Sequence, residues 1–282
     1  MISEVLPGVL LILASTAAYN GSAVLLAVAA RRHSGGSSIL LGTVRRAPGF
    51  FAISLGILGW VLEIAALTLI PLTLARILNV AGLGLLLGLT RWFLKEPLRH
   101  KEFLGVGFIA IGATAASFAP PRLGDIPPGL TQWLLLLLVL GSASMLPYAL
   151  KAVRQPVGAV MGGTAAGLAY ALSGILSKGV ADAVQPVVVV LPLVLLTAGA
   201  IVFGLLSIAV ELEALRTGYA SVVVPVILAI HTVVPIACAP LLFGESWPAG
   251  ILSRTLLGGG LLFALVGTVI LSISSSRVPA KQ

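Results

Sequence analysis

Long apolar stretches separated by short polar segments run the length of the 282-residue chain. Each stretch has about 20 residues or more, which is the length that an α-helix needs to cross the hydrocarbon core of a bilayer. The pattern predicts an all-α polytopic membrane protein with about nine transmembrane helices, at 5–30, 47–69, 72–94, 101–119, 130–150, 156–180, 186–215, 219–243 and 252–274. The stretch 37–46 is too short to span, so we expect either an interfacial piece or the remnant of a tenth helix.

The composition supports a bilayer as the solvent. Hydrophobic residues make up 59% of the chain and charged residues 9%, whereas soluble domains carry about 25% charged residues. The single cysteine, Cys238, lies in an apolar run, where we expect a packed side chain and no disulfide. The first apolar stretch has no basic segment before it, so we expect a retained helix instead of a cleaved signal peptide.

Basic residues orient the predicted helices. With nine spans, thirteen of the 17 Lys and Arg residues fall on one side of the membrane, and Arg122, Lys178 and Arg254 fall on the other. Only Arg76 is left inside a span. Because positive charge collects on the cytoplasmic side, we predict an extracytoplasmic N-terminus and a cytoplasmic C-terminus in the plasma membrane. The net charge of +8 then reflects topology and lipid headgroup contacts, and it does not indicate nucleic acid.

Two segments, 62–98 and 211–247, align without gaps. Each contains a long apolar helix with a glutamate at its end, Glu96 in the first and Glu245 in the second. Both glutamates precede the predicted start of a helix, where a carboxylate is stabilised by the helix dipole. Because the aligned helices lie five predicted spans apart, an odd number, the two copies have opposite orientations in the membrane. Inverted repeats of this kind are typical of secondary transporters, whose substrate sites lie at the interface between the repeats.

The helices that follow these segments also align, with glycines at equivalent positions: Gly105 with Gly260, and Gly112 with Gly267. Small residues spaced in this way let helices approach closely in lipid. Other glycine pairs occur within 84–88 and 158–167. Close packing inside one bundle, a sliding surface between moving helices and a homodimer through these faces remain alternative interpretations.

The stretch "LARILNVAGLGLLLGLTRWFLKEPLRHKEFLGVGFIAIGATAAS" (74–117) and its second copy, "ASVVVPVILAIHTVVPIACAPLLFGES" (220–246), resemble the drug/metabolite transporter (DMT) superfamily, in particular its EamA-like proteins. Typical members have one helix more than is predicted here, and the layout is closest to the branch with NIPA-type magnesium transporters. The resemblance implies a first membrane repeat over 1–120, a connecting helix region over 121–155 and an inverted second repeat over 156–282.

The resemblance also implies a secondary transporter that exports small metabolites or drug-like solutes by alternating access, with coupling to protons or exchange. Magnesium transport of the NIPA type is an alternative, although the midplane offers few of the oxygen ligands that hard cations need. A non-transporting membrane scaffold is the alternative from another class. We expect no enzyme, cofactor or metal site, because nucleotide-binding and zinc-protease motifs are missing. The expected partners are a small-molecule substrate and the lipid bilayer.

Ionisable and polar side chains inside a membrane span are costly, and they mark candidate sites. The candidates for substrate binding or gating are Tyr19, Asn20, Glu63, Arg76, Asn79, Tyr170, Glu211 and His231.

Glu63 and Arg76 lie at equal distances on either side of a turn near Pro71. A helical hairpin therefore brings both side chains to the same depth, on the order of 10 Å below the extracytoplasmic end. We predict an ion pair, with Asn79 one turn further along the same face as Arg76. A structural pair, an arginine that reaches outward alone, and a gate or contact for a substrate carboxylate remain open.

The remaining candidates come from other predicted spans. Glu211 lies near the cytoplasmic end of the seventh span, either as a solvated interfacial residue or as a site for a proton or cation. His231 lies near the middle of the eighth span, either as a packed histidine or as a proton relay. Tyr19 with Asn20, and Tyr170 in the equivalent sixth span, either face a central cavity or pack between helices.

Overall fold

The computed structural model of the chain describes residues 2–31, 47–94, 100–124, 128–152, 159–184, 190–217 and 220–275. The elements within these ranges are helices α1 (Ile2–Arg31), α3 (Ala47–Leu67), α4 (Leu72–Leu94), α5 (His100–Phe118), α6 (Leu130–Leu136), the π-helical turn η1 (Leu137–Gly141), α7 (Ser142–Ala152), α8 (Ala159–Ala183), α9 (Val190–Thr217), α10 (Ala220–Phe243) and α11 (Ile251–Ser275). Because α6, η1 and α7 follow without a break, each predicted span coincides with one helical segment. The stretch 37–46 lies outside the described residues.

Six of the described helices are long and apolar enough to cross a membrane: α1, α3, α8, α9, α10 and α11. Shorter apolar stretches occupy Leu72–Gly82, Phe103–Phe118 and Leu130–Leu146. Over the ranges that the structure describes, the prediction of an all-helical membrane protein is therefore confirmed. Spans at 72–94, 101–119 and 130–150 stay predictions.

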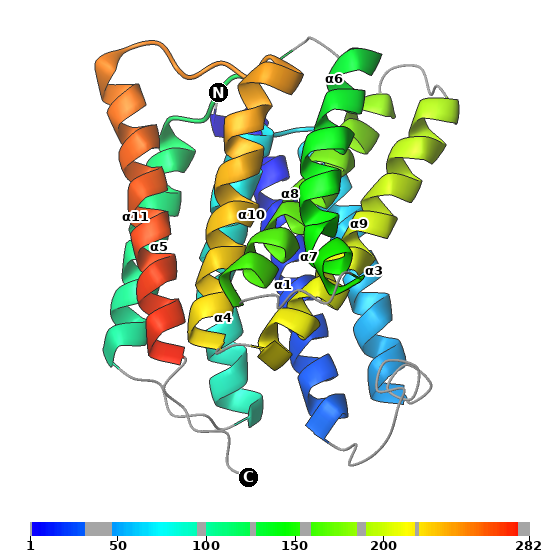
Figure 1. Cartoon of the computed structure of the whole chain (residues 1–282). Coiled ribbons are helices and arrows are strands. Elements are labelled where there is room, and N and C mark those ends of the chain that lie inside the picture. Colours follow the sequence, from blue (N-terminus) through cyan, green and yellow to red (C-terminus); the bar gives the residue numbers. More distant parts are fainter. Residues whose placement is uncertain are drawn as a thin grey trace.

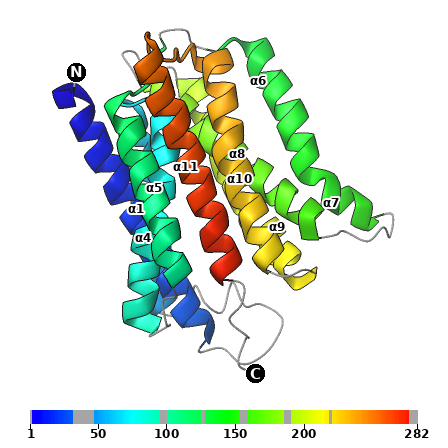
Figure 2. The same ribbon diagram turned by 90° about the vertical axis from the view of Figure 1, so that its left-hand side faces the viewer.

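The helices form one bundle in which successive segments run in opposite directions (Figures 1 and 2). Helix α1 packs against α3 and α4, and helix α8 packs against α9 and α10. Helix α5 packs along α11, and α4 contacts α10. The segment of α6 and α7 stands at one edge of the bundle in Figure 2, where α7 and η1 contact α8.

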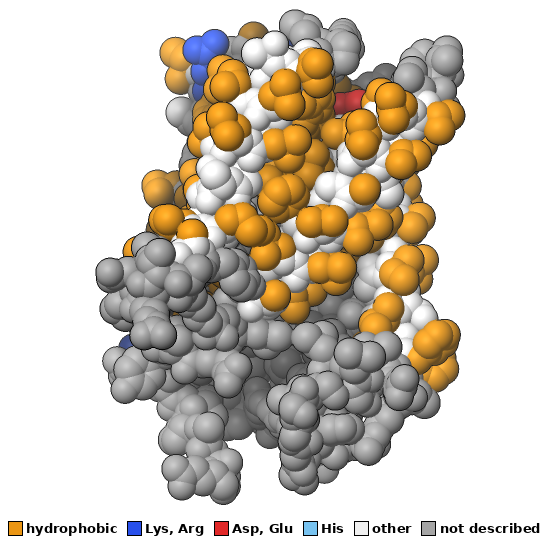
Figure 3. Space-filling model, turned by 45° about the vertical axis from the view of Figure 1, so that its right-hand side comes forward, with side chains coloured by type: hydrophobic (Ala, Val, Ile, Leu, Met, Phe, Trp, Pro, Cys, Tyr) orange, Lys and Arg blue, Asp and Glu red, His pale blue; other side chains and the backbone are white. Residues whose placement is uncertain are grey.

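Apolar side chains cover much of the face in Figure 3. Exposed leucines are found on several helices, including Leu138 on η1 and Leu191 and Leu205 on α9. Charged side chains are found inside the same bundle, among them Glu63 and Arg76. This distribution is the one expected of helices with lipid on the outside, because buried polar groups can satisfy each other there.

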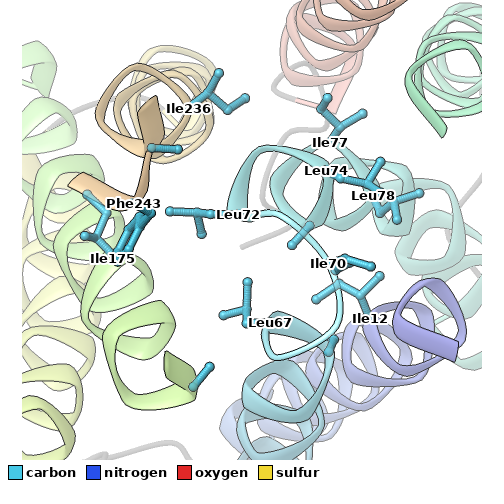
Figure 4. Packing of buried hydrophobic residues seen from close by; sticks show 14 of the residues in the cluster. Ile12, Leu67, Ile70, Leu72, Leu74, Ile77, Leu78, Ile175, Ile236 and Phe243 are labelled. Carbon is cyan, nitrogen blue, oxygen red and sulfur yellow. The ribbon is translucent and has the colours of Figure 1, made fainter. Parts of the chain in front are cut away.

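The largest apolar cluster surrounds the turn between α3 and α4 (Figure 4). Leu67 and Leu72, at the two helix ends, pack in one cluster with Phe243 of α10 and Ile175 of α8. Ile12 of α1 belongs to the same cluster. The turn is therefore held by helices from distant parts of the sequence.

The glycines of α5 and α11 bring two backbones into direct contact. A Cβ atom at Gly112 would lie 2.4 Å from the carbonyl oxygen of Gly260, and one at Gly260 would lie 2.6 Å from that of Gly112. Similarly, a Cβ at Gly267 would lie 2.5 Å from the carbonyl oxygen of Gly105. Only glycine permits this approach, which is a common way for helices to associate in lipid.

The glycines of α8 also serve contacts within the chain. A Cβ at Gly163 or Gly167 would lie 3.1 Å from a carbonyl oxygen of α10, that of Val223 or Ile227 respectively. These two glycines therefore pack α8 against α10. A homodimer through small-residue faces stays a prediction.

Candidate functional site

Arg76 of α4 and Glu63 of α3 form the centre of the candidate site. The guanidinium Nη2 lies 3.0 Å from the carboxylate Oε1. Both residues are buried, with 3% of Arg76 and 5% of Glu63 exposed. The tight turn between α3 and α4 brings the two side chains to the same depth, so the predicted ion pair is confirmed.

Tyr19 of α1 supplies a second contact to the same carboxylate. Its hydroxyl donates a hydrogen bond of 2.9 Å to Glu63 Oε2. The two oxygens of Glu63 therefore face two different helices, with the arginine on one side and the tyrosine on the other.

His231 of α10 lies on the far side of the guanidinium, where its Nε2 is 3.3 Å from Arg76 Nη1. An arginine has donors only, so Nε2 is the acceptor in this contact and the ring proton is on Nδ1. Helix α8 approaches the same group without a side chain at Gly174, where a Cβ would lie 2.0 Å from Nη2. Arg76 thus touches α3, α8 and α10 at once.

Tyr170 of α8 continues the line of polar groups. Its ring lies 5.6 Å from that of His231, measured between ring centroids. Its hydroxyl donates a hydrogen bond of 2.8 Å to Oε2 of Glu211 on α9. Tyrosine and glutamate are therefore paired here, as they are between α1 and α3.

Six of the eight predicted site residues form one connected series, which we call the polar chain: Tyr19, Glu63, Arg76, His231, Tyr170 and Glu211. It passes through α1, α3, α4, α10, α8 and α9 in that order. Each of its members can donate, accept or hold a charge, and the surrounding helices are mostly apolar. The arrangement therefore brings hydrogen-bond donors, acceptors and charges together inside a mostly apolar bundle.

Asn20 and Asn79 lie beside the polar chain, in the contact between α1 and α4. The Asn79 side-chain oxygen is 2.8 Å from the hydroxyl of Thr16, which donates to it. Asn20 Nδ2 donates a hydrogen bond of 2.6 Å to the carbonyl oxygen of Gly82. These two predicted site residues thus bind α1 to α4, and their described contacts lead away from Arg76.

Lys178 has partners within the bundle, and its place on the extracytoplasmic side stays a prediction. Lys178 lies within α8, with 4% of its surface exposed. Its Nζ donates to the carbonyl oxygen of Leu67 over 2.9 Å and to Asp182 Oδ1 over 2.7 Å. A cation at the C-terminal end of α3 is favoured by the helix dipole, so a tertiary contact accounts for this charge.

Glu245 caps a helix, as predicted, but the helix is α4 and not the one that follows it in sequence. Its carboxylate accepts hydrogen bonds from the backbone N–H groups of Leu72 and Thr73 and one of 2.8 Å from the Thr73 hydroxyl. Burial raises the pKa of the Glu245 carboxyl, and these hydrogen bonds partly oppose that rise. Glu96 lies outside the described residues.

No group of three or more His, Cys, Asp and Glu side chains that could hold a metal ion occurs in the described part of the chain. Comparison of the sequence with models of protein families, with curated proteins and with solved structures gives no match.

Proposed function

We propose that the protein is a secondary transporter of small solutes in the plasma membrane, working by alternating access and similar in plan to the DMT superfamily. The observation that carries this proposal is the polar chain. It joins α1, α3 and α4 to α8, α9 and α10 through groups that are costly to keep inside an apolar bundle.

The directions of the helices support two inverted repeats. The contact between Gly8 and Ile70 places the start of α1 at the same end of the bundle as the α3–α4 turn. The contact of Lys178 with Leu67 places the end of α8 there. Helices α1 and α8 therefore run in opposite directions (Figure 1). Each packs against the helix that follows it in the described chain, α3 or α9, and a tyrosine–glutamate hydrogen bond joins each pair.

The glycine contacts support the same symmetry. Gly105 is equivalent to Gly260 in the sequence alignment, and Gly112 is equivalent to Gly267. In the bundle, Gly105 contacts Gly267 and Gly112 contacts Gly260. A twofold operation that exchanges the two repeats would exchange these two contacts, as an inverted pair of helices requires.

Transport is tested by flux into proteoliposomes that contain the purified protein. The solutes should include amino acids, mono- and dicarboxylates, polyamines, sugars, quaternary ammonium compounds and Mg²⁺, each with and without a pH gradient. We expect protein-dependent flux of at least one organic solute. If Mg²⁺ alone moves, the protein is a cation transporter, and if nothing moves, the scaffold alternative replaces the proposal.

Variants connect the flux to the polar chain. We expect Arg76→Gln and Glu63→Gln to reduce the flux by about tenfold or more, since each removes a buried charge-assisted contact. Arg254→Gln is the matched control, because Arg254 is exposed and contacts the backbone at Pro248. If both variants fold and transport at the normal rate, the polar chain is not required for transport.

A further inference from the structure

The guanidinium of Arg76 has more donors than the protein uses. An arginine carries five N–H donors, and its hydrogen-bond contact in the polar chain is that of Nη1 with His231. The ion pair with Glu63 is close, at 3.0 Å. Nevertheless Nε, Nη2 and Glu63 Oε1 are all buried without a hydrogen-bond partner. At this distance the charges of Arg76 and Glu63 compensate each other. A hydrogen bond also requires a suitable angle, and the atoms do not meet that requirement.

Two other buried charged side chains in the bundle, Lys178 and Glu245, have hydrogen-bond partners within the protein. Lys178 donates to both a backbone carbonyl and a carboxylate. The carboxylate of Glu245 accepts three hydrogen bonds from the first turn of α4. Buried polar atoms are usually satisfied in this way, and exceptions call for an explanation. Arg76 and Glu63 are therefore exceptions within their own fold.

A carboxylate is the chemical group that best matches the unused donors. The planar fork of a guanidinium binds the two oxygens of a carboxylate with two parallel hydrogen bonds, through Nε and Nη2. Nε and Nη2 of Arg76 are two such nitrogens, and both are buried without a hydrogen-bond partner. Gly174 of α8 lies directly against the guanidinium, because a side chain there would collide with Nη2. Glu63 meets the guanidinium through one oxygen only, because Tyr19 binds the other.

We propose that Arg76 binds the carboxylate of an acidic solute, that this carboxylate displaces Glu63 from the guanidinium, and that Glu63 takes up one proton as it is displaced. The inference rests on the proposed transport function and names the class of its substrate. The only covalent change is a proton transfer: an acid of the surrounding buffered solution loses the proton and becomes its conjugate base, and the carboxylate of Glu63 gains the O–H bond.

The groups around Glu63 explain why a proton accompanies the substrate. Its ionisable neighbours among the described residues are Tyr19 of α1 and Arg76 of α4, with His231 of α10 behind the guanidinium. Helix α8 contributes Gly174 at this point, and Lys178 one turn further along is bound to Asp182. Two carboxylates cannot share a single buried cation without strong repulsion. Protonation of Glu63 keeps the site neutral before and after the solute binds.

The test measures binding to the purified full-length protein in lipid nanodiscs by titration calorimetry. The probes are acetate, butyrate, benzoate, succinate and glutamate, each beside the amide of the same carbon skeleton. We expect at least one carboxylate to bind about tenfold or more tightly than its amide. Repeating the titration in buffers with different ionisation enthalpies counts the protons, and we expect about one proton per carboxylate. Equal binding of all acids and amides, or no proton uptake, overturns the proposal.

Two variants distinguish the role of Glu63 in proton uptake from the role of Arg76 in carboxylate binding. Glu63→Gln should bind the same carboxylate at least as tightly as the wild type, with no proton uptake and with a larger rise in its melting temperature on binding. The double variant Glu63→Gln/Arg76→Gln removes both charges and so leaves no buried unpaired ion. It should bind the carboxylate about tenfold or more weakly, while Arg254→Gln should match the wild type. Unchanged carboxylate binding by the double variant overturns the proposal even if Glu63→Gln does not fold.

Flux distinguishes this inference from the function on which it rests. Protein-dependent flux of solutes without a carboxylate, together with no binding of the acids, leaves the transport function standing and overturns carboxylate recognition. Binding of the acids that depends on Arg76, with no flux of any solute, supports recognition and overturns transport.

Discussion

Tyr19 and Tyr170 make the same contact in two separate helix pairs. The hydroxyl of Tyr19 donates to Glu63 over 2.9 Å, and that of Tyr170 donates to Glu211 over 2.8 Å. The two carboxylates differ in their other neighbours. Glu63 also faces Arg76, whereas for Glu211 the described residues supply the tyrosine and no basic side chain.

This difference predicts unequal costs for removing the two hydroxyl groups. Tyr170→Phe should lower the free energy of unfolding by about 1–3 kcal/mol, because it removes the hydroxyl that donates to the carboxylate of Glu211. Tyr19→Phe should cost about 0.5–1.5 kcal/mol, because Arg76 still faces Glu63. Denaturation of the purified variants in detergent measures both values. A larger loss for Tyr19→Phe would show that Glu211 has other partners or is in contact with water.

Gly174 provides a test of the space around the guanidinium. An alanine Cβ there would lie 2.0 Å from Nη2 and 2.6 Å from Cζ of Arg76, so the side chain has to move. We expect Gly174→Ala to lower the free energy of unfolding by about 1–3 kcal/mol, as overpacked sites do. Gly107→Ala is the control, because a Cβ at Gly107 meets nothing within 4 Å. Equal stability of the two variants would mean that Arg76 moves aside without cost.

The sequence predicts the contact of Glu63 with Arg76 because it depends only on local geometry. The two residues are separated by a single tight turn, so counting residues along two helices gives their depths. The contact of Arg76 with His231 joins residues 155 positions apart, and it depends on how α4 packs against α10. No local pattern contains that information, although the cost of a polar group in a membrane span identifies both residues as candidates.

Lys178 and Glu245 have tertiary contacts that their positions in the sequence do not predict. A lysine near the end of a predicted span is indistinguishable from a topology signal until the neighbouring helix end is known. The sequence predicts that the carboxylate of Glu245 stabilises a helix, and it does so. The partner is α4 because the chain after α10 turns at Gly244, with a φ of 65°, and returns the side chain toward Leu72.

The cap on α4 predicts that substitution of Glu245, which lies outside the polar chain, destabilises the protein. Glu245→Ala should lower the free energy of unfolding by about 1–3 kcal/mol, because buried N–H groups of Leu72 and Thr73 lose their acceptor. Glu245→Gln keeps one side-chain oxygen as an acceptor, so its loss should be smaller. Thermal unfolding in detergent ranks the two variants. A glutamine variant as unstable as the alanine variant would show that the charge matters more than the hydrogen bonds.

The contact between α5 and α11 predicts different outcomes for adjacent glycines. Gly260→Ala should lower the free energy of unfolding by about 1–3 kcal/mol, because its Cβ would meet the backbone of α5 at Gly112 and Ala116. Gly259→Ala should change it by less than about 0.5 kcal/mol, since a Cβ at Gly259 meets nothing within 4 Å. Denaturation of both variants under the same conditions gives the comparison, and equal losses would contradict the backbone contact.

The α3–α4 turn has a consequence for the order in which the protein is assembled during synthesis. Glu63 and Arg76 come from adjacent helices, so this hairpin can enter the bilayer with its charges already compensated. The groups that bind its two helix ends, Lys178 and Glu245, leave the ribosome more than a hundred residues later. Until then the carbonyl oxygen of Leu67 and the N–H group of Leu72 lack these partners. The finished α3–α4 hairpin therefore depends on residues from the C-terminal half of the chain, and a nascent chain that ends before Glu245 lacks the acceptor for the first N–H groups of α4.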